Sequence, residues 1–242
     1  MPSIMAESTL RTGADTYSSA IETADNYTRW VLEGFRPYFG QHFLEVGLGH
    51  GGYRRFLPGD STYTGLDIDP ECVAQATARN PADRFLVADV TDPDLAQQVH
   101  AEAADTILCI NVLEHIEADT EAVSNLLRVL APGGHLLIFV PAFPALYSDL
   151  DRMAGHIRRY TRADVGRLAI DGAEVVQQRY FNTVGGLGWL ANKALRHSSL
   201  NSTAVNSQIR LFDRFVVPLA RAVDLVGHRV FGQSMTCVLR KP

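Results

Sequence analysis

The sequence contains only three cysteines, and these lie far apart, at Cys72, Cys109 and Cys237. It therefore has no CxxC pair and no zinc or iron–sulfur spacing, and its odd number of separated cysteines is typical of reduced thiols. Nor does it have an apolar run of about 18 residues, the length needed to span a bilayer. The first residues lack the basic and then apolar layout of a signal peptide. These absences predict a cytoplasmic protein.

The chain also carries little positive charge. It has 22 lysine and arginine residues against 27 aspartate and glutamate residues, a formal net charge of -5. A general nucleic-acid binder relies on a basic surface, so we expect no nucleic-acid partner. The 242 residues, 46% hydrophobic and 20% charged, fit one large globular domain or a domain with an insertion.

Short apolar stretches alternate with helical patterns through the first part of the chain. After a helix over residues 17–38, the predicted strands cover residues 43–47, 62–67, 84–89, 105–110 and 135–140. The helices between them are expected over residues 70–80, from Pro93, and along an apolar stripe that ends at Pro132-Gly133-Gly134. Such alternation predicts a doubly wound α/β fold, a parallel sheet with helices on both faces.

Beyond residue 141 the pattern changes. Residues 143–160 form a polar, charged link, followed by a short helix over 163–170 and further strands over 174–181 and 235–239. Roughly fifty residues separate these two strands, which is too long for an ordinary connection. We therefore divide the chain into an N-terminal helical segment (1–40), a core (41–182), a helical insertion (183–232) and a last core strand (233–242).

A glycine-rich turn follows the first predicted strand, in the sequence Glu45-Val46-Gly47-Leu48-Gly49-His50-Gly51. Glycines at such a turn let a ligand approach the backbone, and the free N–H groups of a following helix attract an anion. Because Gly47, Gly49 and Gly52 also satisfy the dinucleotide pattern GxGxxG, the glycines alone do not choose a cofactor.

Acidic residues at three successive strand ends narrow the choice. Glu45 lies inside the first strand, where a buried carboxylate needs a role because its desolvation is costly; it could orient the cationic end of an amino-acid-like cofactor. Asp67 is placed to accept both ribose hydroxyls, and Asp89 to accept from a base edge. Singly, each aspartate could equally be a helix N-cap or a turn residue. Together, the three acids fit the crevice at the switch point of a parallel sheet.

With these motifs in place, the chain resembles the class I S-adenosylmethionine-dependent methyltransferases, of the type 11/12 group. The motifs that carry the resemblance are LEVGLGHG (44–51), GLDIDP (65–70), VADV (87–90), NVLEHI (111–116) and VLAPGGHLLIFVP (129–141). The resemblance implies a seven-stranded Rossmann-like sheet whose last strand is antiparallel, and S-adenosylmethionine as cofactor. The cofactor-binding residues that it implies are Glu45, Gly47, Gly49, Gly51, Asp67, Ile68, Asp89, Val90, Asn111 and Val112.

The acceptor is expected to bind at the link after the fifth strand, where GHIRRYT resembles a subgroup of these methyltransferases, as does RYFNTVGGLGWL further on. His156 is the expected general base, because an imidazole exchanges protons near neutral pH. Tyr160 is a second catalytic candidate, and Arg158 or Arg159 could clamp a carboxylate or phosphate. The residues expected to contact the acceptor are Tyr147, Arg158, Arg159, Asn182 and Trp189. A solvated basic turn is the alternative for this link, and His115 could be a hydrogen-bonded structural residue.

Apolar residues at spacings of three and four predict an amphipathic helix over residues 209–226, which Pro218 could kink. This helix could cap the acceptor pocket, pack between the subunits of a homodimer, or rest on a membrane surface. Its polar face carries aspartates as well as arginines, which disfavours membrane contact but leaves it open.

We interpret the sequence as a methyltransferase for a small-molecule acceptor in secondary metabolism, with oxygen, nitrogen and carbon all open as the methylated atom. The aspartates and asparagine of magnesium-dependent members have no counterpart here, so no metal is expected. The alternatives are an NAD(P)-dependent oxidoreductase and a cofactor-binding, non-catalytic partner protein. A nucleic-acid methyltransferase is disfavoured, because the chain has neither a basic domain nor an NPPY-like tetrad.

Overall fold

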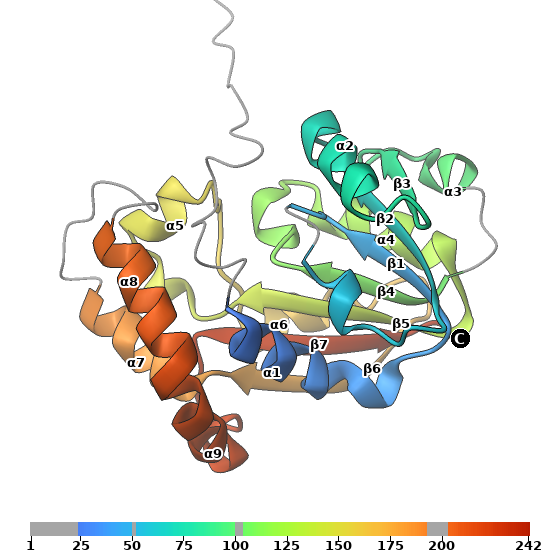
Figure 1. Ribbon diagram of the computed structural model, residues 1–242. Coiled ribbons are helices and arrows are strands. Elements are labelled where there is room, and N and C mark those ends of the chain that lie inside the picture. Colours follow the sequence, from blue (N-terminus) through green and yellow to red (C-terminus); the bar gives the residue numbers. More distant parts are fainter. Residues whose placement is uncertain (1–23, 50–51, 100–103, 193–202) are drawn as a thin grey trace, which may run out of the picture.

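Seven strands form one sheet in the computed structural model of the chain, which describes residues 24–49, 52–99, 104–192 and 203–242 (Figure 1). The strands are β1 (His42–Val46), β2 (Thr62–Asp67), β3 (Arg84–Val87), β4 (Ala104–Ile110), β5 (Leu130–Pro141), β6 (Glu174–Phe181) and β7 (Ser234–Arg240). Their order is β3-β2-β1-β4-β5-β7-β6. Strands β1 to β5 pair in parallel, and β7 runs antiparallel between β5 and β6. This confirms the predicted Rossmann-like sheet with an antiparallel last strand.

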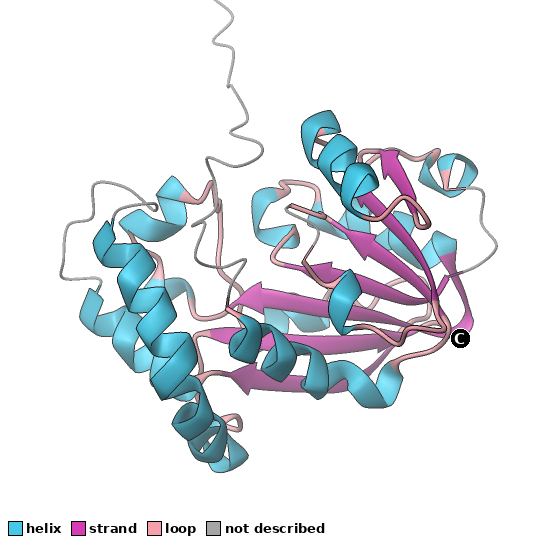
Figure 2. Cartoon of the chain, in the orientation of Figure 1, coloured by secondary structure: helices cyan, strands magenta, loops and turns pink. Residues whose placement is uncertain are grey.

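Helices cover both faces of the sheet (Figure 2). One face packs against α1 (Asp25–Phe35), α2 (Pro70–Arg79) and α9 (Val217–Gly227), the other against α3 (Leu95–Gln98), α4 (Asp119–Val129) and α6 (Arg162–Gly166). Side chains of a strand alternate between faces, so Ile107 joins the α4 side and Leu108 the α1 side. The central strands β4 and β5 are buried on both faces along most of their length, and their buried residues are largely apolar, as in parallel sheets generally.

Short helical turns occupy several connections: η3 (Arg36–Tyr38), η4 (Arg54–Phe56), η5 (Leu113–His115), η6 (Pro144–Leu146) and α5 (Asp149–Met153). Two of them, η6 and α5, lie in the link predicted over residues 143–160. The helix predicted over 163–170 is shorter, since α6 ends at Gly166. The helix predicted over 17–38 is observed as α1 and η3, and its residues 17–23 lie outside the described part of the chain.

The insertion is helical where it is described. It contains α7 (Thr183–Asn192), α8 (Thr203–Leu211) and a π-helical turn η7 (Phe212–Val216), which leads into α9. The predicted amphipathic helix is therefore longer than expected, and a π-helical turn interrupts it. Pro218 lies in the first turn of α9, directly after the π-helical turn. Figure 1 shows α7 and α8 at the end of the sheet toward which β5 points. None of the helices among the described residues has the length and apolar character needed to cross a membrane.

The fifth strand begins five residues earlier than expected, at Leu130, directly after α4. Ala104 pairs with Leu130, but Thr106 pairs with His135, so the intervening residues of β5 bulge out of the register. Gly133, with φ 76°, lies in this bulge. The sequence Pro132-Gly133-Gly134 therefore lies within the strand, and the helix expected to stop there ends shortly before it, at Val129.

Candidate active site

The loop after β1 has a backbone shape that favours glycine. Gly47 has a φ of 72° and Gly49 a φ of 49°, in the left-handed region that residues with a Cβ seldom adopt. Hydrogen bonds tie this loop to β2, because the Gly47 N–H donates to the Leu66 carbonyl at 2.9 Å and the Gly49 N–H donates to Asp67 Oδ2 at 3.0 Å. The third glycine of the prediction, Gly51, lies outside the described residues.

Glu45 is buried in β1, with 1% of its surface exposed. Its Oε2 accepts a hydrogen bond from the Tyr63 hydroxyl at 2.7 Å, while its Oε1 has no hydrogen-bond partner among the described residues. Burial raises the pKa of this carboxyl to about 8. A buried acceptor without a partner is costly, so Glu45 is suited to receive a donor or a cation from a ligand.

The acids of the next two strands lie at the carboxyl ends of adjacent strands, since β1, β2 and β3 are neighbours in the sheet. Asp67 Oδ1 accepts the Asp69 N–H at 2.9 Å. Asp89 is exposed, and its Oδ1 accepts hydrogen bonds from the backbone and hydroxyl of Thr91. Beside these acids, Ile68 is half exposed and Val90 is buried. The structure therefore brings these four predicted residues to the end of the sheet where the glycine loop lies.

Asn111 and Val112 follow β4, the strand on the other side of β1. Asn111 has a φ of 54°, and its N–H donates to the Phe139 carbonyl at 2.8 Å. Val112 lies directly against the glycine loop, because a Cβ atom built on Gly47 would come within 2.5 Å of its Cγ2. The glycine loop thus packs against the segment that leads from β4 into η5.

One glutamate and two histidines meet just beyond this segment. Glu114 and His115 belong to η5, and His156 comes from the link after α5. One potential ligand atom of each lies within 4.8 Å of the others. Glu114 is fully buried, and neither of its carboxylate oxygens has a hydrogen-bond partner among the described residues. Burial raises the pKa of Glu114 to about 7 and lowers the pKa of His115 to about 4. Burial therefore favours the neutral form of both side chains.

Hydrogen bonds to the Nδ1 atoms fix the orientation of both imidazole rings. His156 Nδ1 lies 3.0 Å from Asp151 Oδ1, and His115 Nδ1 lies 3.2 Å from the Gly155 carbonyl. Burial acts to raise the pKa of Asp151, but hydrogen bonds and charges of His156 and Arg159 outweigh it and lower the pKa. Since each Nδ1 is engaged, each Nε2 is left to the cluster, and His156 Nε2 lies 3.8 Å from Glu114 Oε1.

The structure corrects three of the expected acceptor-side roles. Tyr160 is 2% exposed, and its hydroxyl lies 3.0 Å from the Leu113 carbonyl and 2.9 Å from Asp119 Oδ2, so it is a structural residue. Arg159 is also buried, and its guanidinium donates to Asp151 and to the carbonyl of Ala142. The third is Asn182.

Asn182 is fully buried at the junction between β6 and α7. Its side chain donates to Gln233 Oε1 at 2.9 Å and accepts the Gly185 N–H at 2.8 Å, and the Gln233 N–H donates to its carbonyl at 3.1 Å. These bonds join the two ends of the insertion. Asn182 therefore supports the fold and does not present its amide to an acceptor.

The other expected acceptor-side residues remain at or near the cluster. Arg158 is a third exposed and bonds to Asp119 and to the Glu117 carbonyl. The Tyr147 hydroxyl donates to the His156 carbonyl at 2.6 Å, and Trp189 Nε1 donates to the Leu146 carbonyl at 3.2 Å. The tyrosine and tryptophan rings are partly exposed and lie beside the link that carries His156.

Sequence reasoning missed Glu114 as a site residue, and it found no set of metal ligands. The signal was an acid and a histidine directly after an apolar strand, in Asn111-Val112-Leu113-Glu114-His115. His156 lies 41 residues further on, so only the fold shows that it joins them.

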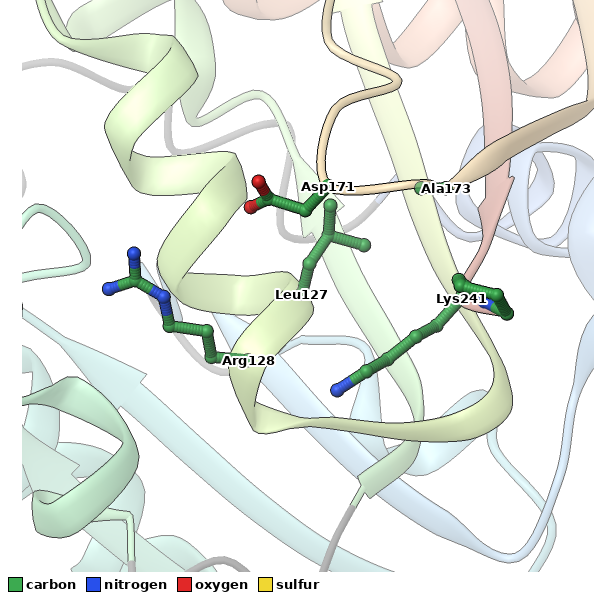
Figure 3. A pocket seen from close by; sticks show the side chains of 6 residues that line it. Leu127, Arg128, Asp171, Ala173 and Lys241 are labelled. Atoms are coloured by element: carbon green, nitrogen blue, oxygen red, sulfur yellow. The ribbon is translucent and has the colours of Figure 1, made fainter.

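A separate pocket of about 190 Å³ lies at the opposite end of the sheet (Figure 3). It is lined by Leu127, Arg128, Asp171, Ala173, Lys241 and Pro242. The Lys241 N–H donates to the Gly134 carbonyl near the amino end of β5, whereas the glycine loop lies at carboxyl ends. This pocket therefore does not contribute to the candidate active site.

Residues 44–138 match a family model described as "Methyltransferase domain". A ubiquinone biosynthesis O-methyltransferase of Vibrio parahaemolyticus is 29% identical over 140 residues, which cover 57% of this chain and 54% of that protein. A probable S-adenosylmethionine-dependent methyltransferase of Mycolicibacterium smegmatis is 34% identical over 105 residues, which cover 42% of this chain and 38% of that protein. The matched segments thus span about half or less of these relatives' own length.

Among solved structures, the chain is similar to the N-methyltransferase NodS of Bradyrhizobium japonicum in complex with S-adenosyl-L-homocysteine. The TM-score is 0.55 at 16% identity, and the match covers 95% of this chain and 100% of that one. At this identity the likeness concerns the fold, and it agrees with the sheet order described above.

Proposed function

We infer that this chain, whose residues 44–138 match a methyltransferase domain model, transfers a methyl group from S-adenosylmethionine to a small-molecule acceptor. The observation that carries the proposal is Glu45, a buried carboxylate with an unpartnered oxygen, beside a loop that glycines shape. A cationic, amino-acid-like group would supply the missing partner. S-adenosylmethionine has such a group, whereas a nicotinamide dinucleotide presents a pyrophosphate instead.

Each predicted cofactor residue has a role in this proposal. Glu45 and the loop of Gly47, Gly49 and Gly51 hold the methionine part. Asp67 accepts the ribose hydroxyls in place of its present bond to the Gly49 N–H. The residues expected to bind the adenine are Ile68, Asp89 and Val90, and those beside the sulfonium are Asn111 and Val112.

Methyl transfer is an in-line displacement. A lone pair of the acceptor atom forms the new bond to the methyl carbon, and the electrons of the broken carbon–sulfur bond stay on sulfur, giving S-adenosylhomocysteine. The sulfonium is already activated, so positioning and exclusion of water supply most of the rate. The protein must orient the acceptor and, where the acceptor carries a proton, provide for its removal.

The acceptor side of the proposal lies at the cluster of Glu114, His115 and His156. Tyr147 and Arg158 belong to the link that carries His156, and Trp189 lies beside it. These three residues remain our candidates for contact with the acceptor. An oxygen acceptor is favoured, because the curated relative from Vibrio is named an O-methyltransferase. A place in secondary metabolism remains a prediction from the sequence.

Isothermal titration with S-adenosylhomocysteine and with NAD tests the cofactor assignment. We expect binding of S-adenosylhomocysteine, and a loss of affinity of about tenfold or more in Glu45→Gln and Asp67→Asn, since each removes a charged hydrogen bond. Asp60→Asn, at an exposed position, is the matched control and should bind normally. Binding of NAD alone would support the oxidoreductase alternative and overturn the proposal.

Turnover separates an enzyme from a cofactor-binding partner protein. The chain is incubated with S-adenosylmethionine and a panel of hydroxyl, amine and thiol acceptors, and S-adenosylhomocysteine is quantified. Product with any acceptor supports catalysis. Tight cofactor binding without product across the panel, or with cell extract as acceptor, would favour the non-catalytic alternative.

A further inference from the structure

We propose that Glu114, His115 and His156 form a binding site for a divalent transition-metal ion, and that this ion is zinc. The three residues come from two segments that are distant in the chain, η5 and the link after α5. Their ligand atoms lie within 4.8 Å of one another, at a place where the described part of the chain offers them little else to bind.

The carboxylate of Glu114 is the first argument. It is 0% exposed, and neither of its oxygens has a hydrogen-bond partner among the described residues. Its nearest cationic candidate is His156, whose Nε2 lies at 3.8 Å from Oε1, beyond hydrogen-bond distance. A buried carboxylate without partners is expensive, and a bound cation would satisfy both oxygens.

The second argument is the way in which the histidines are held. Histidines that bind a metal almost always engage their other ring nitrogen with a carboxylate or a backbone carbonyl, which fixes tautomer and orientation. His156 has this relationship with Asp151, at 3.0 Å, and His115 has it with the Gly155 carbonyl, at 3.2 Å. Arg159 holds the same oxygen of Asp151 at 2.9 Å, so the carboxylate is itself fixed. With each Nδ1 engaged in this way, Nε2 is the nitrogen that each ring would offer to a metal.

The donor set favours a transition-metal ion over magnesium, and zinc is the ion of this class that we propose. Two imidazole nitrogens and one carboxylate oxygen are the ligands of catalytic zinc sites, which leave a fourth position open, whereas magnesium prefers a shell of oxygen atoms. Two ligands of a tetrahedral zinc ion are about 3.3 Å apart, given bond lengths of about 2.0 Å. The 3.8 Å between His156 Nε2 and Glu114 Oε1 is somewhat longer than this separation, so these two ligand atoms would move closer together when an ion binds.

The position of the site gives the ion a function, and this step rests on the methyl transfer proposed above. Glu114 lies two residues beyond Val112, whose methyl group packs against the cofactor loop at Gly47. An acceptor hydroxyl in the open position of the zinc ion would lose its proton to solvent more easily, because the metal lowers its pKa. The resulting alkoxide or phenolate oxygen then attacks the methyl carbon. His156 acts here as a ligand, in place of the general base expected from the sequence, and the acceptor class is an alcohol or phenol.

Zinc titration of the metal-depleted chain tests the site without requiring turnover. After dialysis against a chelator, the chain competes with a chromophoric zinc indicator, and MgCl2 is titrated in parallel. We expect one equivalent of zinc to bind and magnesium not to displace it. Glu114→Gln and His115→Gln should each weaken zinc binding by about 100-fold or more, since each removes a direct ligand. His135→Gln, within β5 where His135 pairs with Thr106 of β4, is the matched histidine control and should retain wild-type affinity.

Cobalt substitution gives a readout on the wild-type chain alone, so the test does not depend on whether the variants fold. A tetrahedral Co²⁺ ion in this site should give intense visible absorption, and a six-coordinate, water-bound ion should not. Failure of the wild-type chain to bind zinc, equal affinity in Glu114→Gln, or equal loss in His135→Gln would each overturn the proposal. Binding of S-adenosylhomocysteine to the same proteins without zinc separates the two hypotheses. If cofactor binding persists and zinc binding fails, the metal site alone is wrong; if cofactor binding fails, the proposed function is wrong.

Discussion

A Cβ atom at Gly47 would lie 2.5 Å from Cγ2 of Val112, so these two residues are in direct contact only because Gly47 has no side chain. Gly47 belongs to the loop assigned to the cofactor, and Val112 leads into the η5 turn that holds Glu114 and His115. The contact therefore fixes the distance between the two halves of the candidate active site.

Substitution of Gly47 tests this contact. Gly47→Ala introduces both a Cβ clash with Val112 and a side chain at a φ of 72°. We expect the free energy of unfolding to fall by about 1–3 kcal/mol and the affinity for S-adenosylhomocysteine to be largely lost. Urea unfolding and isothermal titration measure the two effects. Gly52→Ala is the control, because nothing lies within 4 Å of a Cβ atom there; equal behaviour of the two variants would contradict the assignment.

The dependence of the free energy of unfolding on pH should reveal the raised pKa of the buried Glu45. Its pKa is about 8 in the folded chain, raised by burial from an ordinary value of 4.5. Between these values the folded state holds a proton that the unfolded state has released. The contribution of this proton to the free energy of unfolding is therefore complete below pH 4.5. It is lost as the pH rises toward 8, by at most about 1.4 kcal/mol per pH unit.

Urea unfolding of the cofactor-free chain at several pH values checks this expectation. Glu45→Gln removes the titrating group and keeps an acceptor for Tyr63, so the variant should gain stability relative to wild type as the pH rises from 5 to 8. Parallel stability curves for the two proteins would show that Glu45 is ionised in the fold.

The sheet, and the end of it at which the expected cofactor-side residues lie, could be predicted from local sequence, because both depend on the order of short strands and turns. The strand predicted over 62–67 is observed as β2 with the same bounds. The three acids follow from strand ends that a parallel sheet places on one edge. The early start of β5 was not predicted, because Pro132-Gly133-Gly134 resembles a helix end in the local sequence. Only the fold shows that the residues on either side of it, Leu130 and His135, both pair with β4.

The acceptor side could not be predicted, because its contacts join distant segments. His156 meets Glu114 only after the link folds back along η5, where the Ile157 N–H donates to the Glu114 carbonyl at 2.9 Å. The roles proposed for Tyr160 and Arg159 came from residue type and from the resemblance of GHIRRYT to a subgroup of methyltransferases. The burial of these two side chains depends on the tertiary packing, and so do their hydrogen bonds to carbonyl and carboxylate groups.

Tyr160→Phe tests the correction to the role of Tyr160. The change removes a hydroxyl that bonds to Asp119 and the Leu113 carbonyl, so we expect a loss of about 1–2 kcal/mol in the free energy of unfolding. Affinity for S-adenosylhomocysteine and turnover with any acceptor found should stay within about twofold of wild type. Tyr38→Phe, before β1, controls for loss of a tyrosine hydroxyl. Full stability combined with lost turnover would restore Tyr160 as a catalytic candidate.

Asp224→Asn tests how the insertion is held. The carboxylate of Asp224 is buried and accepts the N–H groups of Asn182 at 2.6 Å and Thr183 at 2.8 Å, where α7 begins. An amide retains one acceptor but places a donor against an N–H group, which should cost about 1–3 kcal/mol. We expect limited proteolysis to cut residues 183–232 faster while the core persists. Glu174→Gln, exposed on β6, should leave the digestion pattern unchanged; slower cleavage in Asp224→Asn would contradict this role.

The hydrogen bonds between Asn182 and Gln233 mean that the insertion leaves the core and returns to it at a single point. The pairing of Phe181 with Ser234 continues the β6–β7 ladder up to that point, so the ladder does not depend on what lies between. Residues 183–232 are therefore joined to the strand ladder at this junction, and they also pack on the sheet through Val217 and Ala220 of α9. Another helical segment grafted between the same two residues could change which acceptors are admitted, provided that it covers the face of the sheet that α9 covers here.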